Sequence, residues 1–470
     1  MSMDQVRNTL EFILKGSVHG YRPKPTRLKE IRRPDGSARK ICVPEIWDRL
    51  VQQCILQIIE PICEARFSNN SYGYRPNRCA EHAIAETHRL MQRSHMRYII
   101  ECEIGELSAC ISHAKLIRQI WALGIRDRTL IFILKRILRS PVRMPDGRVV
   151  MNETGIIQGG ILGPVFLNIA LNELDQWIDS QWQEHPVIHA FNCPVNSQGV
   201  RIKSNAYSAM RKTNLKEMYI IRYGEHIRIF CRKHWDAVRT GYAVEKWLRR
   251  RMKLSPSAIH IKIVDTHCRY MKFLGFKLKL FKRGTKWVVK SHVDDDRIQG
   301  IYRTLKRQFA KIPHARNKHH ATSLIRRYNI SVLAIQHYYD IATDVSIDFR
   351  KVQYLINIVA KGRLHANRKN KGLLVRNGRM LSEFEKKRYG CSTALRYYKR
   401  SGEPVYPIGY ANPRPPLSKK RSVCSYTPEG RRQLSVKNKV HLDLLIALMK
   451  RPVRQESLEY NANRIALYSA

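Results

Sequence analysis

Residues 218–231 read MYIIRYGEHIRIFC, and this stretch decides the fold. Two short apolar runs flank Tyr223-Gly224-Glu225, a pattern typical of a β-hairpin whose turn contains the glycine. Residues 97–104 (RYIIECEI) are a further apolar run of strand length. The sequence therefore predicts a hairpin at the first stretch and a buried strand at the second.

In the segments on either side of these strands, apolar side chains recur at other spacings. Residues 48–66 place apolar side chains at helical spacing, with Asp48 as a candidate cap, and Pro164 is well placed to start another helix. Residues 272–290 alternate as a second hairpin would, and the pattern from about 297 to 365 is helical again. We therefore expect a mixed α/β region to about residue 295, then a helical basic domain and an irregular basic tail.

Charge is the main feature of the composition. The 470 residues carry 86 Lys and Arg against 38 Asp and Glu, a formal net charge of +48. A surplus of that size repels itself in a compact protein, so a polyanionic partner is indicated, with nucleic acid first and an anionic membrane surface second. The length predicts two or three domains.

Several classes of protein are disfavoured by the same reading. No apolar run approaches the ~20 residues of a bilayer-spanning helix, and residues 1–20 lack a signal-peptide core. The 11 cysteines are odd in number and contain no Cys-x-x-Cys pair, which argues against a disulfide framework and a zinc site. We expect a protein that is not secreted, does not bind membranes and resides in a reducing compartment.

The positive charge is densest in the C-terminal third. Residues 301–470 hold 35 Lys and Arg against 10 Asp and Glu, with tyrosines interleaved among the basic clusters. Basic side chains bind phosphates, and aromatic rings stack on unpaired bases. For any single residue, a solvated charged surface over core tyrosines remains the alternative. Taken together, the clusters indicate an RNA-binding region.

Short motifs in a fixed order carry a family resemblance. They are Tyr21-Arg22-Pro23-Lys24-Pro25, Pro34-Asp35-Gly36, Asp48-Arg49-Leu50-Val51-Gln52-Gln53, Ser71-Tyr72-Gly73-Tyr74-Arg75-Pro76, Gln158-Gly159-Gly160, Leu171-Asn172-Glu173-Leu174-Asp175, Phe273-Leu274-Gly275-Phe276-Lys277, His337-Tyr338-Tyr339 and Glu459-Tyr460-Asn461-Ala462-Asn463-Arg464. Each is weak alone, but in this order they make the chain resemble the group II intron-encoded reverse transcriptases and maturases.

The resemblance implies an α/β (α+β) right-hand polymerase fold. Residues 1–95 would hold a partial N-terminal segment and the fingers, and residues 96–295 the palm with its antiparallel sheet. Residues 296–380 would form the helical thumb, or maturase domain X. Residues 381–470 would be a basic C-terminal region that stops before the HNH endonuclease of some relatives.

The resemblance also assigns contacts to particular residues. Those expected to face the template or the nucleotide are Arg33, Arg39, Arg75, Arg78, Ser108, Gln158, Gly159, Gly160 and Lys262. In the basic third, those expected to bind RNA are Lys361, Arg363, Arg368, Lys369, Arg376, Arg379, Lys419, Lys420 and Arg421.

The catalytic positions depart from the family pattern. Its polymerases hold two Mg²⁺ ions with three Asp carboxylates, and here those positions are Glu103, Glu225 and His226. The aromatic position near the first of them is Ser108, and the Asp that follows is Ala109. Glu projects one methylene further than Asp, and imidazole suits a hard, oxygen-preferring cation poorly. Glu103 and Glu225 are therefore only weak candidates for metal ligands.

The hypothesis that follows is a maturase-like RNA-binding protein that assists intron folding and splicing without polymerising. The alternative is an active RNA-directed DNA polymerase in which Glu103 and Glu225 hold Mg²⁺ or Mn²⁺; an expressed relic without a role is a third reading. Mg²⁺ is expected only if polymerase activity remains, and otherwise no cofactor. The partner is RNA, while DNA binding and a homodimer stay open, as does the compartment, bacterial cytoplasm or organellar matrix.

Overall fold

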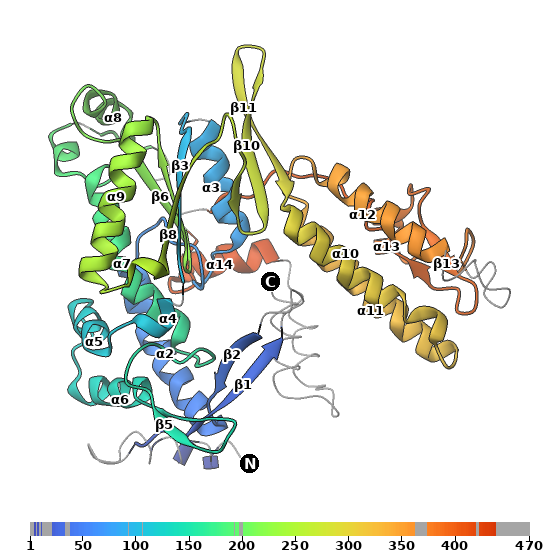
Figure 1. Ribbon diagram of the computed structural model, residues 1–470, viewed down its shortest axis with the longest axis horizontal. Helices are drawn as coiled ribbons and strands as arrows, with labels where there is room; N and C mark the ends of the chain where they lie inside the picture. Colours follow the sequence, from blue (N-terminus) through green and yellow to red (C-terminus); the bar gives the residue numbers. More distant parts are fainter. Residues whose placement is uncertain are drawn as a thin grey trace.

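The computed structural model has a central antiparallel sheet, β6-β7-β3-β8, that joins distant parts of the chain (Figure 1). Its strands are β3 (Tyr98–Ile104), β6 (Met218–Tyr223), β7 (His226–Cys231) and β8 (Ile259–Asp265). The structure describes residues 4–5, 7–8, 11, 21–32, 38–92, 94–105, 107–191, 193–196, 201–361, 374–419 and 423–438.

The hairpin expected from residues 218–231 is present as β6 and β7. Tyr223 pairs with His226, so the loop has two residues, Gly224 and Glu225. Gly224 has a φ of +60°, which glycine adopts without steric cost and which a tight turn between twisted strands requires. This short turn fixes where Glu225 and His226 lie relative to β3.

Helices cover both faces of the central sheet. Helix α9 (His234–Arg251) contacts β3, β7 and β8, whereas α3 (Ala80–Gln92) and α7 (Gly163–Gln181) contact β6. Figure 1 shows the sheet lying between α9 and α3. The other helices on this side are α4 (Leu107–Cys110), α5 (His113–Ala122), α6 (Arg128–Leu138) and α8 (Ser204–Met210). No helix in the described stretches is long and apolar enough to cross a membrane.

Helix α2 (Ile46–Arg66) corresponds to the helix expected over residues 48–66, but the expectation that Asp48 caps it is wrong. The helix begins earlier, with Glu45 at the N-cap position. Asp48 is buried in the first turn, where its carboxylate accepts hydrogen bonds from the Tyr21 hydroxyl (2.9 Å) and the Lys24 amide (3.1 Å). Asp48 therefore ties the segment before β1 to the helix instead of satisfying the helix end.

A second sheet lies beside α2. It has the order β2-β1-β4-β5, with β1 (Thr26–Arg32), β2 (Ala38–Val43), β4 (Pro141–Arg143) and β5 (Val149–Met151). A third sheet, β11-β10-β9, contains the projecting hairpin that the alternation at 272–290 predicts. Its strands are β9 (Met271–Phe273), β10 (Phe276–Arg283) and β11 (Lys286–Val293).

Beyond this hairpin the chain is helical, as the sequence predicts. The helices are α10 (Asp295–Phe309), α11 (Lys318–Tyr339) and α12 (Val345–Ala360). A small sheet, β12-β13-β14, with α13 (Glu383–Tyr389), packs beside α11 and α12. Its strands are β12 (Leu374–Val375), β13 (Arg396–Tyr398) and β14 (Pro404–Val405).

After this sheet the tail returns to α2 and α3. Arg414 forms ion pairs with Asp340, at the end of α11, and with Glu81 on α3. Further on, the Tyr426 hydroxyl donates to Glu60 of α2 at 2.6 Å. The last described helix, α14 (Pro428–Asn438), lies next to α3 in Figure 1. The tail therefore links the helical part of the protein to the part that contains the central sheet.

Candidate functional site

Strand register places two of the predicted catalytic positions, Glu103 and His226, on one face of the central sheet. Glu103 of β3 lies opposite His226 of β7 and His260 of β8. Two residues earlier, Glu101 lies opposite Arg228 and Lys262. Directly opposed residues share a face, as do residues i and i+2 of one strand. This face therefore carries two carboxylates among two cations and two imidazoles.

The carboxylate of Glu103 is bound by the neighbouring strand. Arg228 Nη2 lies 3.0 Å from Glu103 Oε1, and His226 Nδ1 lies 3.7 Å from the same oxygen. These two groups, His226 first and Arg228 second, lower the pKa of Glu103 to about 2. The Arg228 side chain is buried, and its Nε and Nη2 also donate to the Lys272 carbonyl (3.0 and 2.6 Å). The buried Arg228 guanidinium thus pairs with the negative charge of the Glu103 carboxylate.

The other two family positions lie at the hairpin turn. Glu225 Oε1 accepts a hydrogen bond from the Ser108 hydroxyl at 2.9 Å, which joins the turn to α4. Ser108 stands where the family has an aromatic residue, so this contact brings two of the predicted site residues together. His226 follows in β7 and faces Glu103, as described above.

These donors do not fit a pair of Mg²⁺ ions. Magnesium takes carboxylate and water oxygens in near-octahedral geometry, and a carboxylate bound to Arg228 has its charge already neutralised. The imidazole of His226 is a poor third ligand for such a cation. Nowhere in the described ranges do three or more His, Cys, Asp or Glu side chains gather in a metal-binding arrangement.

The lowered pKa of Glu103 predicts a pH dependence of stability. An acid whose pKa is lower in the folded state stabilises the fold above its unfolded pKa, near 4.5, and loses that contribution as the pH falls towards 2. We expect Glu103→Gln to lower Tm by roughly 1–2 °C at pH 6, because the carboxylate is half exposed, and by progressively less between pH 4.5 and pH 3. Thermal scans across this range measure it. Glu153→Gln, at an exposed carboxylate, is the control, and a difference that does not vary with pH would contradict the ion pair.

A buried ion pair stabilises the turn between β6 and β7. Arg222 donates from Nε and Nη2 to both oxygens of Asp175 on α7, at 2.7–2.9 Å, and each side chain is 1% exposed. Its Nη1 reaches Asn168 Oδ1 (2.9 Å) and the Gly224 carbonyl (3.2 Å). The guanidinium therefore connects α7 to the backbone of the turn.

The segment that includes Gly73 and Tyr74 lies directly over this turn. A Cβ on Gly73 would come within 2.4 Å of the Gly224 amide nitrogen, so only glycine allows this approach. The Tyr74 ring is exposed and sits against Gly224, with its centroid 6.1 Å from that of Tyr223. The motif thus packs against the turn that carries Glu225.

The arginines expected to face template or nucleotide have local roles where they are described. Arg75 is buried and forms a bidentate ion pair with Glu64 (2.7 and 2.9 Å). Arg78 donates to backbone carbonyls of its own loop and lies over the Tyr72 ring. Arg39 is in β2, but its side chain is outside the described part, as is all of Arg33. Lys262 is exposed on the sheet face of Glu103.

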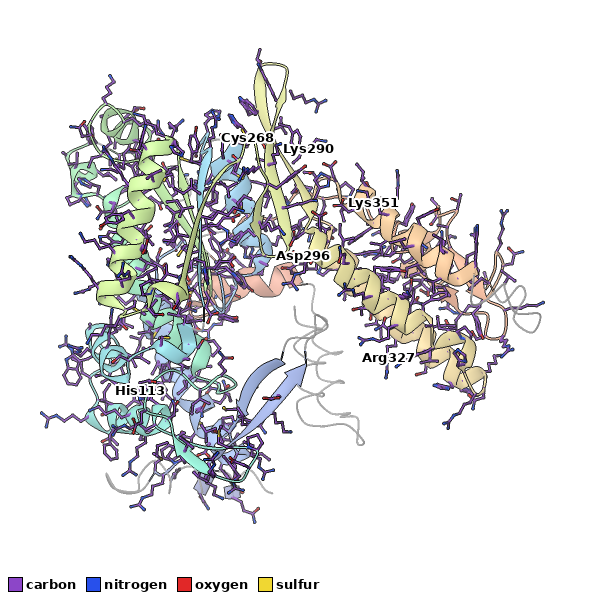
Figure 2. The ribbon with its side chains drawn as sticks, viewed as in Figure 1. His113, Cys268, Lys290, Asp296, Arg327 and Lys351 are labelled. Carbon is purple, nitrogen blue, oxygen red and sulfur yellow. The ribbon has the colours of Figure 1, made fainter. Side chains whose placement is uncertain are left out.

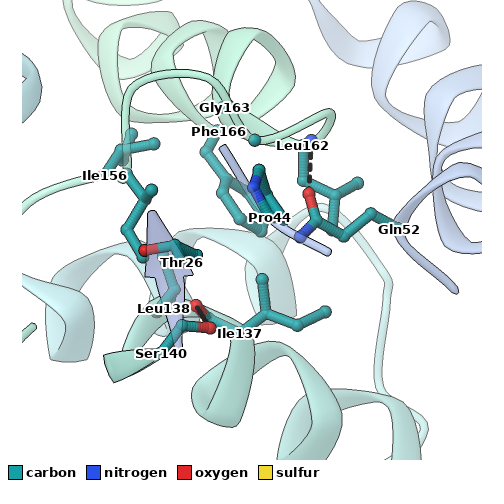
Figure 3. Close-up of a pocket in the computed structure, with 12 residues that line it drawn as sticks. Thr26, Pro44, Gln52, Ile137, Leu138, Ser140, Ile156, Leu162, Gly163 and Phe166 are labelled. Carbon is teal, nitrogen blue, oxygen red and sulfur yellow. Dashed lines mark hydrogen bonds between the residues drawn. The ribbon is translucent and has the colours of Figure 1, made fainter. Parts of the chain in front are cut away.

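Gln158-Gly159-Gly160 lies where α7 meets the second sheet. The Gln158 carbonyl accepts from the Cys42 amide of β2 at 2.7 Å. Beside Gly160 is a cavity of about 20 Å³, room for a single water, bordered by the Gln52 side chain (Figure 3). Gln52 Oε1 accepts hydrogen bonds from the Ile161 amide (2.8 Å) and the Leu162 amide (3.5 Å). The cavity is a gap in packing and too small for a nucleotide.

The basic residues expected to bind RNA are partly described. Lys361 and Arg376 are exposed, whereas Lys419 is half-buried and donates to the Val423 carbonyl (2.7 Å). Arg379 forms ion pairs with Glu385 (2.8 Å) and Glu403 (3.0 Å), so its charge is paired within the part of the protein that contains the small sheet. The remaining predicted RNA contacts, all outside the described ranges, are Arg363, Arg368, Lys369, Lys420 and Arg421. Figure 2 shows further cations, among them Arg327 and Lys351, projecting from α11 and α12.

Sequence reasoning missed the residues that complete the site. Arg228 flanks the two carboxylates of β3, beside the predicted Lys262, and Arg222 with Asp175 supports the turn. Arg228 could have been suspected only from strand alternation, because it lies two residues after His226 and so shares its face.

Comparison with known proteins identifies the relatives. A sequence model described as "Reverse transcriptase (RNA-dependent DNA polymerase)" matches residues 24–278. Protein YkfC of Escherichia coli is 29% identical over 165 residues, covering 34% of this chain and 43% of YkfC. Group II intron-encoded protein LtrA of Lactococcus lactis is 28% identical over 181 residues, covering 38% and 28% of the two chains.

A plant relative extends the same set. Nuclear intron maturase 2, mitochondrial, of Arabidopsis thaliana is 25% identical over 238 residues, covering 39% of this chain and 31% of the maturase. In each comparison the matching region spans less than half of the relative's length. The matched family covers more than half of this chain, including every strand of the central sheet. The chain belongs to the reverse transcriptase family and, within it, to the group II intron-encoded reverse transcriptases and maturases.

Proposed function

We propose that this protein is a maturase-like RNA-binding protein that assists the folding and splicing of a group II intron, with polymerase activity lost. The observation that carries the proposal is the Glu103–Arg228 ion pair, because a carboxylate already bound to a protein guanidinium is a poorer metal ligand. Such a protein would act where its intron is transcribed, in a bacterial cytoplasm or an organellar matrix.

The proposed partner is structured RNA. The net charge of +48 requires a polyanion, and exposed cations on α11, α12 and the segments that follow supply phosphate contacts. We assign residues 21–95 to fingers, 96–295 to palm and 296–380 to thumb, with 381–470 as the basic C-terminal region. The splicing chemistry belongs to the RNA in this proposal. The protein positions helices of the RNA and neutralises phosphates.

Loss of polymerisation is the part that departs from the family. Two-metal transfer needs ions that clamp the attacking and leaving oxygens. Here one carboxylate faces Arg228, another accepts from Ser108, and the third position is an imidazole. Displacement of reacting groups by ~1 Å can cost ~100-fold in rate, and all three positions differ from Asp. These contacts therefore support the loss of nucleotide transfer.

Primer extension tests this part directly. We expect the purified full-length chain, given an RNA template, a DNA primer and dNTPs with Mg²⁺ or Mn²⁺, to extend no more primer than a Glu103→Ala/Glu225→Ala variant. The physical reason is the resident guanidinium at Glu103. An active group II intron reverse transcriptase in the same buffer serves as positive control. Extension that the double variant abolishes would establish the alternative, an active polymerase with atypical ligands.

Splicing assays test the positive part of the proposal. Precursor RNA carrying the cognate intron should splice faster, or at lower Mg²⁺ concentration, when the protein is added. No acceleration at saturating protein would reject the maturase role, whatever primer extension shows.

A further inference from the structure

A surface groove on the helical part of the protein has the lining of a nucleotide site. We call it the Arg350 groove; it lies between α12 and the segments at 391–394 and 409–410 and encloses about 330 Å³. Small-molecule sites span ~300–1,000 Å³, so the groove can hold one nucleotide. Its lining residues are Arg350, Gln353, Tyr354, Asn357, Cys391, Ser392, Thr393, Ala394, Gly409 and Tyr410.

The helix side of the groove presents groups that suit an anion and a ring. Arg350, Gln353, Tyr354 and Asn357 follow each other at helical spacing on one face of α12. Arg350 is exposed and forms no ion pair with any described carboxylate. The Tyr354 ring is 66% exposed, although burial of an aromatic ring is normally favourable. No lining residue is acidic, which favours an anionic ligand.

The polar side chains that line the groove differ in how they are paired within the protein. The Ser392 hydroxyl oxygen is buried and has no hydrogen-bond partner among the described residues, and leaving such a group unsatisfied is costly. Gln353 donates to Asn357 Oδ1 at 2.8 Å, which directs the Asn357 amide nitrogen away from Gln353. The Gly409 amide donates to Gln353 Oε1 at 3.2 Å, which joins the segment at 409–410 to α12. The side chains of Gln353 and Asn357 are thus fixed by the protein, and the exposed Asn357 amide nitrogen is left to a ligand.

We propose that the Arg350 groove binds a single unpaired nucleotide of the RNA partner, with its base against Tyr354 and its phosphate on Arg350. This inference rests on the proposed function, because it names where that RNA is held. Aromatic faces accept any base, while a cation beside them fixes the backbone. The groove therefore recognises a splayed-out nucleotide and is too small for a duplex. Lys361, exposed at the end of the same helix and at helical spacing from Asn357, adds a further positive charge.

Binding of a labelled 12-nucleotide oligo(U) to the full-length protein tests the proposal. Tyr354→Ala should weaken this binding by roughly fivefold to a hundredfold, the effect of losing one stacked base. Tyr354→Phe should restore it, and Arg350→Ala should lower the slope of log K against log salt by about one. Tyr242→Ala on α9 is the matched control, because Tyr242 is 67% exposed, and it should change affinity less than twofold.

The outcomes separate this site from the wider proposal. If Tyr354→Ala binds oligo(U) within twofold of the parent while the parent binds intron RNA, the groove assignment fails and the RNA-binding proposal stands. If the parent binds no intron RNA, the proposed function itself fails. Oligo(dT) bound as tightly as oligo(U) would overturn the assignment to RNA, and UMP bound as tightly would overturn the assignment to a nucleotide within a chain. A uridine photo-crosslink at Tyr354 is the supporting physical readout.

Discussion

Replacing Arg222 by alanine is expected to lower the free energy of unfolding of the central sheet by about 3–5 kcal/mol, the usual cost of removing one partner of a buried ion pair. Arg222 and Asp175 are each 1% exposed, so the substitution leaves a buried carboxylate without its cation. It also removes the donor to the Gly224 carbonyl in the turn. Urea unfolding followed by circular dichroism measures the loss, and hydrogen exchange in β6 and β7 locates it.

A double-mutant cycle provides the control for this prediction. The cycle compares Arg222→Met and Asp175→Leu, each made singly, with the double variant that carries both. The double variant replaces both charges with apolar side chains, and such replacements are often neutral or stabilising. The double variant should therefore lose far less stability than the sum of the single variants. A loss below about 1 kcal/mol for Arg222→Ala would show that the pair does not support the turn. If the loss of stability in the double variant equals the sum of the losses in the two single variants, the two side chains act independently.

The second large effect is on RNA affinity. Neutralising seven cations of the basic third should weaken binding to intron RNA by about 100-fold or more at 0.1 M salt. It should also reduce the slope of log K against log salt by up to about six, since each phosphate contact contributes ~0.7–0.9. The seven, each changed to Gln, are Lys361, Arg363, Arg368, Lys369, Arg376, Lys420 and Arg421. Arg379 and Lys419 stay, because they hold protein groups.

A variant of equal charge distinguishes local contact from net charge. Its seven substitutions to Gln fall on exposed cations of the other part of the protein, at Arg118, Arg126, Arg128, Lys135, Arg139, Arg143 and Lys212. If binding depends on the basic third, this control should lose far less affinity. Equal losses in both variants would mean that the charge of the whole molecule, and not this region, holds the RNA.

Local patterns predicted the elements well, because each is encoded in consecutive residues. The hairpin of residues 218–231 has its turn and both strands within fourteen positions, and the structure has β6 and β7 there. The helix from Pro164 appears as α7. The start of α2 was misplaced because Asp48, a good cap by composition, has Tyr21 and the Lys24 amide as tertiary partners.

Long-range pairing explains what the sequence could not supply. Motif order located Glu103, but its partner Arg228 is 125 residues away, and the contact depends on the register of β3 against β7. Likewise, Arg75 was expected to face a phosphate, and the structure gives it Glu64. A sequence shows that an arginine is present but not which carboxylate the fold brings to it.

Arg414 has a consequence for how a large folded polyanion can approach. One guanidinium is bound to Asp340 at the end of α11 and to Glu81 on α3, so the end of α11 cannot move away from α3 without breaking one of these two ion pairs. These ion pairs therefore hold the end of α11 in a fixed position relative to α3. A large folded polyanion that approaches both α11 and α3 must therefore fit this arrangement or break one of the two ion pairs.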